Sequence, residues 1–216
     1  VVFDPVAKLA KTGEIFTVTT EGEQTYQARA IIVATGTERR RLNIPGEKEL
    51  TGKGVSFCVT CDAPFYWGKT VALVGGSDAA CSSAVHLAEF TQKIYLIYRK
   101  GCLRAEPFWT QQWESLVSQG KGEAIYNTNL VAIISQSQLA LPSSTVWDKV
   151  GAVKLDKPFK DSDILRIDGV FIEIGGVPGT ALVAPLGVSL DPGGYIHVDE
   201  RMQTNIPGLF AAGDLV

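Results

Sequence analysis

The sequence predicts an α/β fold with a parallel sheet, and three observations support this class. A strand–turn–helix–strand pattern occupies residues 69–98, a continuous apolar run occupies residues 30–34, and short β-like runs alternate with turns over residues 124–167. Strands that alternate with helices are typical of parallel sheets, whereas short runs between turns favour an antiparallel meander. With 216 residues, 45% of them hydrophobic and 20% charged, the chain can bury a sizeable core.

The first part of the chain is rich in β-branched and aromatic residues. Residues 15–20 and 25–28 predict a β-hairpin around Glu21-Gly22-Glu23. Residues 30–34 then predict a strand buried on both faces, because the run is apolar throughout and ends in Thr35-Gly36.

A polar stretch separates this part from a βαβ unit. Residues 38–53 contain several charges and a proline, which favours a linker. Buried strands over residues 70–74 and 93–98 flank a helix over residues 79–90, whose apolar residues recur at helical spacing.

Pro107 is suited to the first turn of a further helix. An antiparallel meander is expected over residues 124–167, and residues 169–176 predict another strand and turn.

The composition excludes several classes of partner. The net charge of −3 lacks the basic excess that is typical of nucleic-acid binding. No apolar run reaches the roughly 20 residues that a membrane-spanning helix needs, so we expect no membrane partner. One close cysteine pair with two scattered single cysteines fits a reducing compartment, which favours a cytoplasmic protein.

The most informative motif is Cys58-Val59-Thr60-Cys61-Asp62. Two cysteines separated by two residues can open and close a disulfide, and Asp62 adds a proton donor and acceptor at such a centre. Zinc is the rival use of this spacing, but a structural zinc site needs four ligands and the chain has no second pair. We therefore expect a redox pair and no metal.

The turn after residues 70–74 has the spacing of a dinucleotide-binding fingerprint. Glycines permit the tight turn and keep the backbone open to a pyrophosphate, which would lie at the helix N-terminus. A plain glycine turn is the alternative, but the strand–turn–helix context favours nucleotide binding. The candidate residues are Gly75, Gly76, Ser77, Asp78 and Ala79.

The end of the next strand indicates which nucleotide binds. NAD sites place an acid there for the ribose hydroxyls, whereas this chain has Arg99, Lys100 and Arg104. Three cations favour the 2′-phosphate of NADPH over a merely solvated basic loop.

The remaining reactive side chains carry weaker signals. Cys81 and Cys102 are lone cysteines, which more often pack than react. His86 and His197 have no nearby catalytic partners, so we expect structural or surface roles.

With these motifs in order, the chain resembles the low-molecular-weight thioredoxin reductases, of the pyridine nucleotide–disulfide oxidoreductase class. The resemblance covers nearly the whole chain. It is carried by residues 31–36, 54–62, 74–80, 98–106 and 204–214.

The resemblance implies FAD and NADPH as cofactors, a thioredoxin-like protein as substrate and a homodimer in the full-length protein. It places Thr35, Gly36, Gly213 and Asp214 at the FAD, and Gly175 among the cofactor-binding residues. It also implies that NADPH reduces FAD, that FAD opens the Cys58–Cys61 disulfide, and that Cys58 attacks the substrate while Cys61 lies nearer the flavin.

The resemblance further predicts a Rossmann-like NADPH domain with the redox pair at residues 42–168. This domain would be inserted in a partial FAD-binding domain formed by residues 1–41 and 169–216, with hinges near Leu42 and Gly169. The chain is expected to be a fragment that binds FAD poorly and is inactive by itself. Two alternatives remain, a non-catalytic NADPH-binding fragment and a ferredoxin or flavodoxin–NADP reductase, although the latter class lacks the cysteine pair.

Overall fold

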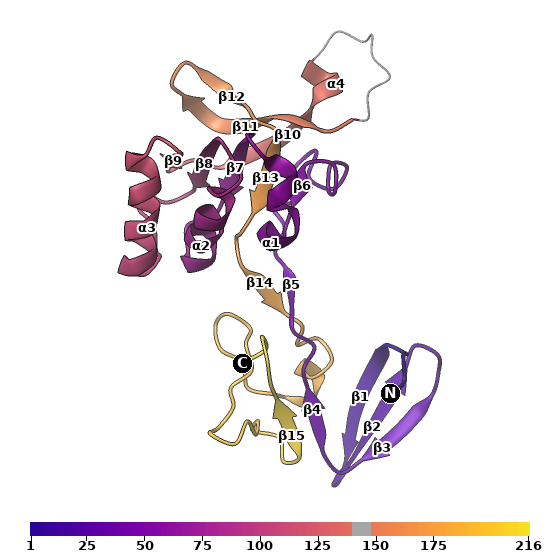
Figure 1. Cartoon of the computed structure of the whole chain (residues 1–216). Coiled ribbons are helices and arrows are strands. Elements are labelled where there is room, and N and C mark those ends of the chain that lie inside the picture. Colours follow the sequence, from indigo (N-terminus) through magenta and orange to yellow (C-terminus); the bar gives the residue numbers. More distant parts are fainter. Residues whose placement is uncertain (140–147) are drawn as a thin grey trace. The chain divides into compact units, whose positions relative to one another are not determined.

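The computed structural model describes residues 1–139 and 148–216, so part of the predicted meander lies outside the described residues. The chain divides into two compact units (Figure 1). Unit 1 contains Val1–Arg39 and Gly176–Val216, and unit 2 contains Arg40–Gly175. None of the described helices is long and apolar enough to span a bilayer.

Unit 2 is built on a five-stranded sheet in which every neighbouring pair is parallel. The strand order is β6-β13-β7-β8-β9. The strands are β6 (Val55–Ser56), β13 (Gly169–Ile172), β7 (Thr70–Val74), β8 (Lys93–Tyr98) and β9 (Gly122–Tyr126).

Helices cover one face of this sheet and an antiparallel meander covers the other (Figure 1). The helices are α2 (Asp78–Leu87) and α3 (Pro107–Ser118), and the meander contains β10 (Leu130–Ser135), β11 (Val150–Phe159) and β12 (Ser162–Arg166). Alternate residues of β7 serve the two layers, since Leu73 packs with the helices and Ala72 with the meander. This double burial explains why β7 is apolar throughout.

Short helical segments complete unit 2. The cysteine pair lies at α1 (Val59–Asp62), which runs into the 3-10 helix η1 (Ala63–Tyr66). A third short helix, α4 (Gln136–Leu139), follows β10.

Unit 1 contains three small sheets. An antiparallel sheet joins β1 (Val6–Thr12), β2 (Ile15–Thr20) and β3 (Thr25–Ala28), which confirms the predicted hairpin and adds β1. The other pairs are the parallel β4 (Ile31–Val33) with β15 (Leu209–Ala211) and the antiparallel β5 (Thr37–Arg39) with β14 (Gly176–Pro178). The 3-10 helix η2 (Ala184–Leu186) lies between β14 and β15.

Three expectations about the elements were wrong. Residues 38–53 are not a free linker, because Glu47 and Leu50 are buried and the Glu47 carboxylate accepts hydrogen bonds from the backbone N–H groups of Leu42 and Asn43. The first strand of the expected meander, β9, instead extends the parallel sheet. β4 is not buried on both faces, since Ile32 is 72% exposed on a strand that pairs only with β15 among the described residues.

The division between the units also differs from the sequence-based boundaries. Residues 169–175 belong to unit 2 because β13 is hydrogen-bonded between β6 and β7. Gly169 is the first residue of β13 and lies against the ring of Tyr66, which would be 2.2 Å from an added Cβ. The chain instead passes between the units at β5 and β14.

Candidate functional site

The candidate functional residues of unit 2 follow the ends of its parallel strands. Cys58, Glu173 and Gly75 come after β6, β13 and β7, and Arg99 comes directly after β8. The carboxyl ends of parallel strands meet at one edge of a sheet, which is where ligands bind in open α/β sheets. The chain therefore places its cysteine pair, its glycine turn and its basic residues along a single edge.

The cysteine pair is closed as a disulfide. Cys58 and Cys61 are bonded, with Cα atoms 5.3 Å apart. Cys58 is half-buried and Cys61 is exposed, so the pair is open to a reaction partner rather than sealed in the core. Asp62 is half-buried at the end of α1, and its backbone N–H donates to the Cys58 carbonyl oxygen over 3.2 Å.

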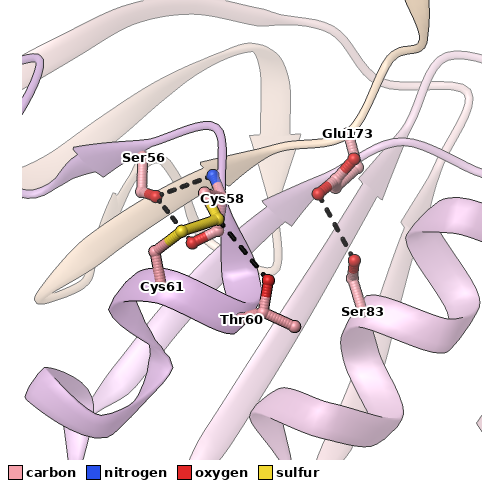
Figure 2. Close-up of a disulfide and its surroundings, with 6 residues drawn as sticks. All are labelled: Ser56, Cys58, Thr60, Cys61, Ser83 and Glu173. Atoms are coloured by element: carbon pink, nitrogen blue, oxygen red, sulfur yellow. Dashed lines mark hydrogen bonds between the residues drawn. A yellow bond between two sulfur atoms is a disulfide. The ribbon is translucent and has the colours of Figure 1, made fainter.

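Two hydroxyl groups surround Cys58 (Figure 2). The buried Ser56 Oγ accepts a hydrogen bond from the Cys58 N–H over 3.0 Å and donates one to the Cys58 carbonyl oxygen over 3.2 Å. The Thr60 Oγ1 lies 3.5 Å from the Cys58 Sγ. These contacts fix the backbone of Cys58 and give its sulfur a polar neighbour.

The segment that follows β13 contributes a buried acid, Glu173, and a glycine with a positive φ, Gly175. Glu173 is 5% exposed, and its Oε1 accepts a hydrogen bond of 3.4 Å from Ser83 Oγ of α2 (Figure 2). Gly175 has a φ of +90° with open space around it, and its carbonyl oxygen accepts from the Arg40 N–H.

The turn at residues 75–78, here called the Gly75 turn, requires its glycines. Gly75 has a φ of +151°, and an added Cβ would lie 2.2 Å from the Glu173 carbonyl oxygen. A Cβ on Gly76 would lie 2.5 Å from the ring of Tyr98. The turn then leads into α2 through Ser77 as its N-cap, and Asp78 and Ala79 of the first turn are exposed.

The loop at residues 99–106, here called the basic loop, is tied to the Gly75 turn by two hydrogen bonds. The Arg104 N–H donates to the Gly76 carbonyl oxygen over 2.8 Å, and the Glu106 N–H donates to the Asp78 Oδ1 over 2.7 Å. These bonds hold the loop beside the first turn of α2.

The cations of the basic loop are available to an anion. Arg99, Lys100 and Arg104 are exposed, and none forms an ion pair within residues 1–139 and 148–216. Three unpaired cations beside a backbone turn form a positively charged edge.

In unit 1 the residues predicted to contact FAD also share one sheet edge. β4 and β15 are parallel, with Val33 opposite Ala211, so Thr35-Gly36 and Gly213-Asp214 leave the same end of the pair. Gly36 and Gly213 have φ values of +66° and +79°, with no atom within 4 Å of an added Cβ. Thr35 Oγ1 donates to the Gly179 carbonyl oxygen over 2.8 Å.

The other reactive side chains have separate environments. Cys81 is fully buried, and burial, with a smaller effect of Asp78, raises its pKa to about 11. Cys102 is exposed in the basic loop. His86 of α2 lies 3.8 Å from the carboxylate of Glu89, which follows that helix, and His197 is exposed in unit 1.

The sequence patterns did not indicate a role at the site for four polar residues of unit 2, namely Ser56, Thr60, Ser83 and Glu173. Glu173 could have been noticed, because it is an acid within the apolar run of residues 170–174. The hydroxyl groups carry no such signal, since serine and threonine are common near turns.

Comparison with known proteins agrees with these features. The model of the family described as pyridine nucleotide-disulphide oxidoreductase matches residues 2–216. Thioredoxin reductase of Listeria innocua is 39% identical over 204 residues, which cover 94% of this chain and 60% of the relative. Thioredoxin reductase of Treponema pallidum is 36% identical over 216 residues, which cover all of this chain and 65% of the relative.

The fold is also similar to solved structures. A crystal structure of Lactococcus lactis thioredoxin reductase matches with a TM-score of 0.80 and 30% identity, covering 99% of this chain and 66% of that one. This chain thus spans about 60 to 65% of the length of the two relatives named above. The family match over residues 2–216 and the fold similarity lead to one conclusion: the chain belongs to the pyridine nucleotide-disulphide oxidoreductase family.

Proposed function

We propose that this chain carries the nucleotide-binding and disulfide parts of a flavoprotein disulfide reductase, which transfers electrons from NADPH through FAD and the Cys58–Cys61 disulfide to a thioredoxin-like protein. The observation that carries this proposal is the position of the disulfide. It follows β6 at the sheet edge where the Gly75 turn follows β7, with only β13 between these strands. The relatives named thioredoxin reductase support the same activity.

In this proposal unit 2 binds NADPH. The Gly75 turn offers backbone without side chains to a pyrophosphate, and the first turn of α2 offers free N–H groups. Arg99, Lys100 and Arg104 would pair with the 2′-phosphate, because bidentate or charge-assisted contacts to phosphate need cations without other partners.

Unit 1 contributes to FAD binding through the edge formed by Thr35-Gly36 and Gly213-Asp214. Its two glycines have open backbones, which fits close approach of a nucleotide cofactor, and Asp214 is exposed as an acceptor for ribityl hydroxyl groups. When bound, NADPH and FAD would supply the electron pair that opens the disulfide.

The chain's own residues then perform the thiol chemistry. Cys58 would attack the disulfide of the partner protein, and Cys61 would re-form the bond with Cys58 and release the reduced partner. Asp62, the last residue of α1, would take and return the protons of the dithiol. We further propose that the partner is a thioredoxin-like protein and that the whole protein is a cytoplasmic homodimer.

Trapping the mixed disulfide tests this function. Purified protein containing this chain, with Cys61→Ser, is mixed with an oxidised thioredoxin-like protein after reduction by NADPH or a phosphine. We expect a covalent complex through Cys58, since the second thiol that resolves it is missing. Cys58→Ser is the matched control and should form little complex. Nucleotide binding with no complex in either variant would instead favour a non-catalytic NADPH-binding protein.

The nucleotide preference is tested separately by titration with NADPH and NADH. Arg99→Ala and Arg104→Ala should each weaken NADPH binding about tenfold and leave NADH binding nearly unchanged, because only NADPH carries the 2′-phosphate. Arg166→Ala is the control, since Arg166 is an exposed arginine at the end of β12. Equal affinity of the unchanged chain for both nucleotides would contradict this part of the proposal.

A further inference from the structure

The hydrogen bonds around the disulfide are asymmetric. Thr60 Oγ1 lies 3.5 Å from Cys58 Sγ, whereas Cys61 Sγ has no hydrogen bond to any residue that the structure describes (Figure 2). A disulfide sulfur carries no proton, so the Thr60 hydroxyl must be the donor and the sulfur the acceptor. The donor therefore already points at one particular sulfur while the pair is oxidised.

The backbone around Cys58 holds this geometry in place. Ser56 Oγ is bonded to both the N–H and the carbonyl oxygen of Cys58, and Ser56 is only 5% exposed. Thr60 is the second residue of α1, which starts directly after Cys58. Opening the disulfide removes a bond between two side chains but none of these backbone contacts.

We propose that Thr60 selects Cys58 as the attacking thiolate by donating a hydrogen bond to its sulfur once the disulfide is open. This inference rests on the proposed function. A hydrogen bond to a charged acceptor is roughly twice as strong as one to a neutral acceptor, so the Thr60 hydroxyl stabilises the thiolate of Cys58 more than its thiol. Cys61 receives no such bond from the described residues and is followed by the carboxylate of Asp62.

The thiol–disulfide exchange that Cys58 begins transfers two electrons to the partner protein. The Cys58 thiolate forms a bond to one sulfur of the partner's disulfide, and the partner's other sulfur leaves as a thiolate that takes a proton. The Cys61 thiolate then attacks Cys58 Sγ, restores the Cys58–Cys61 bond and expels the second partner sulfur. The partner gains the two electrons that the dithiol loses.

Exposure alone would give the opposite order of reactivity. Cys61 is exposed and Cys58 is half-buried, so an alkylating reagent would modify Cys61 first if solvent exposure alone decided the rate. Two charged residues adjoin the cysteine motif. Asp62 follows Cys61 in the sequence, and the guanidinium of Arg41 lies 5.1 Å from the ring centroid of Phe57, the residue before Cys58. Both stay constant when only Thr60 is changed.

The test is the partition of alkylation between the two cysteines in this chain after reduction by a phosphine. A brief treatment with less than one equivalent of iodoacetamide at neutral pH is followed by digestion and fragment mass spectrometry. We expect Thr60→Val to lower the ratio of modified Cys58 to modified Cys61 about threefold. Losing the hydrogen bond should lower the fraction of Cys58 present as thiolate about tenfold. The ratio falls less than this, because a thiolate whose thiol has a higher pKa is intrinsically more nucleophilic.

Two variants keep this result interpretable. Thr60→Ser retains a hydroxyl and should keep the ratio of the unchanged chain, and Thr25→Val makes the same substitution on an exposed strand of unit 1 and should have no effect. A ratio that is the same in Thr60→Val as in the unchanged chain, or that falls equally in Thr60→Ser, would overturn the inference. The assay contains no nucleotide, flavin or partner protein, so its outcome is independent of the trapping experiment.

Discussion

The Asp78 carboxylate accepts a hydrogen bond of 2.7 Å from the backbone N–H of Glu106. Asp78 begins α2 and Glu106 precedes α3, so this bond fastens the end of the basic loop to the start of the helix that follows the Gly75 turn. The Asp78 side chain thus holds the basic loop, which carries Arg99, Lys100 and Arg104, beside the Gly75 turn.

This bond predicts different effects for two substitutions of Asp78. Asp78→Ala removes the acceptor and frees the loop, so the dissociation constant for NADPH should rise about threefold to tenfold. Asp78→Asn keeps an acceptor oxygen and removes a negative charge beside the Gly75 turn, where we propose that the phosphates of NADPH bind, so NADPH should bind at least as tightly as before. Titration with NADPH, and with NADH as the nucleotide that lacks the 2′-phosphate, measures both. Equal weakening in the two variants would contradict the anchoring role.

Gly75 and Gly52 should respond differently to the same substitution. Both have positive φ values, but an added Cβ meets the Glu173 carbonyl oxygen and the Ala80 Cβ only at Gly75. We expect Gly75→Ala to lower the free energy of unfolding by about 3 kcal/mol, from overpacking and backbone strain together. Gly52→Ala should cost about 1 kcal/mol, from strain alone. Urea unfolding followed by circular dichroism measures both, and similar costs would contradict the packing argument.

Cys81 should make the stability of unit 2 depend on pH in the alkaline range. Its pKa rises from 9.0 to about 11 in the folded chain, chiefly through burial, so the folded state retains a proton that the unfolded state loses. This contribution to stability is complete below about pH 9 and is lost as the pH rises to about 11.

The free energy of unfolding of the unchanged chain should therefore fall between these values, and Cys81→Ala should reduce the fall. The pKa of Tyr66 is raised to about 12 by burial and by Asp62 and Asp168, so Tyr66 also lowers the stability, but at higher pH. This contribution is still present in Cys81→Ala. A fall of the same size in Cys81→Ala would rule out the thiol as its source.

The parts of the fold that the sequence predicts are those set by local patterns. β7, the Gly75 turn, α2 and β8 follow from a doubly buried strand, a glycine turn and helical spacing within thirty residues. The hairpin of β2 and β3 follows equally from its turn. The disulfide is also local, because only two residues separate Cys58 from Cys61.

The parts that the sequence does not predict depend on distant partners. β9 has the composition of any half-buried strand, and only its place beside β8 makes it parallel. Residues 38–53 look like a linker because their charges are many, yet the Glu47 carboxylate satisfies backbone N–H groups inside a packed turn. The contact between Ser83 and Glu173 joins residues 90 positions apart, which no local pattern reveals.

The crossing between the units has a practical consequence. The backbone N–H of Arg40 donates to the carbonyl oxygen of Gly175 over 3.0 Å, so the first and last residues of unit 2 meet. A segment whose ends touch can be cut out, circularised or transplanted as a cassette without stretching either junction. Expressed separately, residues 40–175 would present the disulfide and the Gly75 turn on a module small enough for nuclear magnetic resonance, where each cysteine could be followed through its redox cycle.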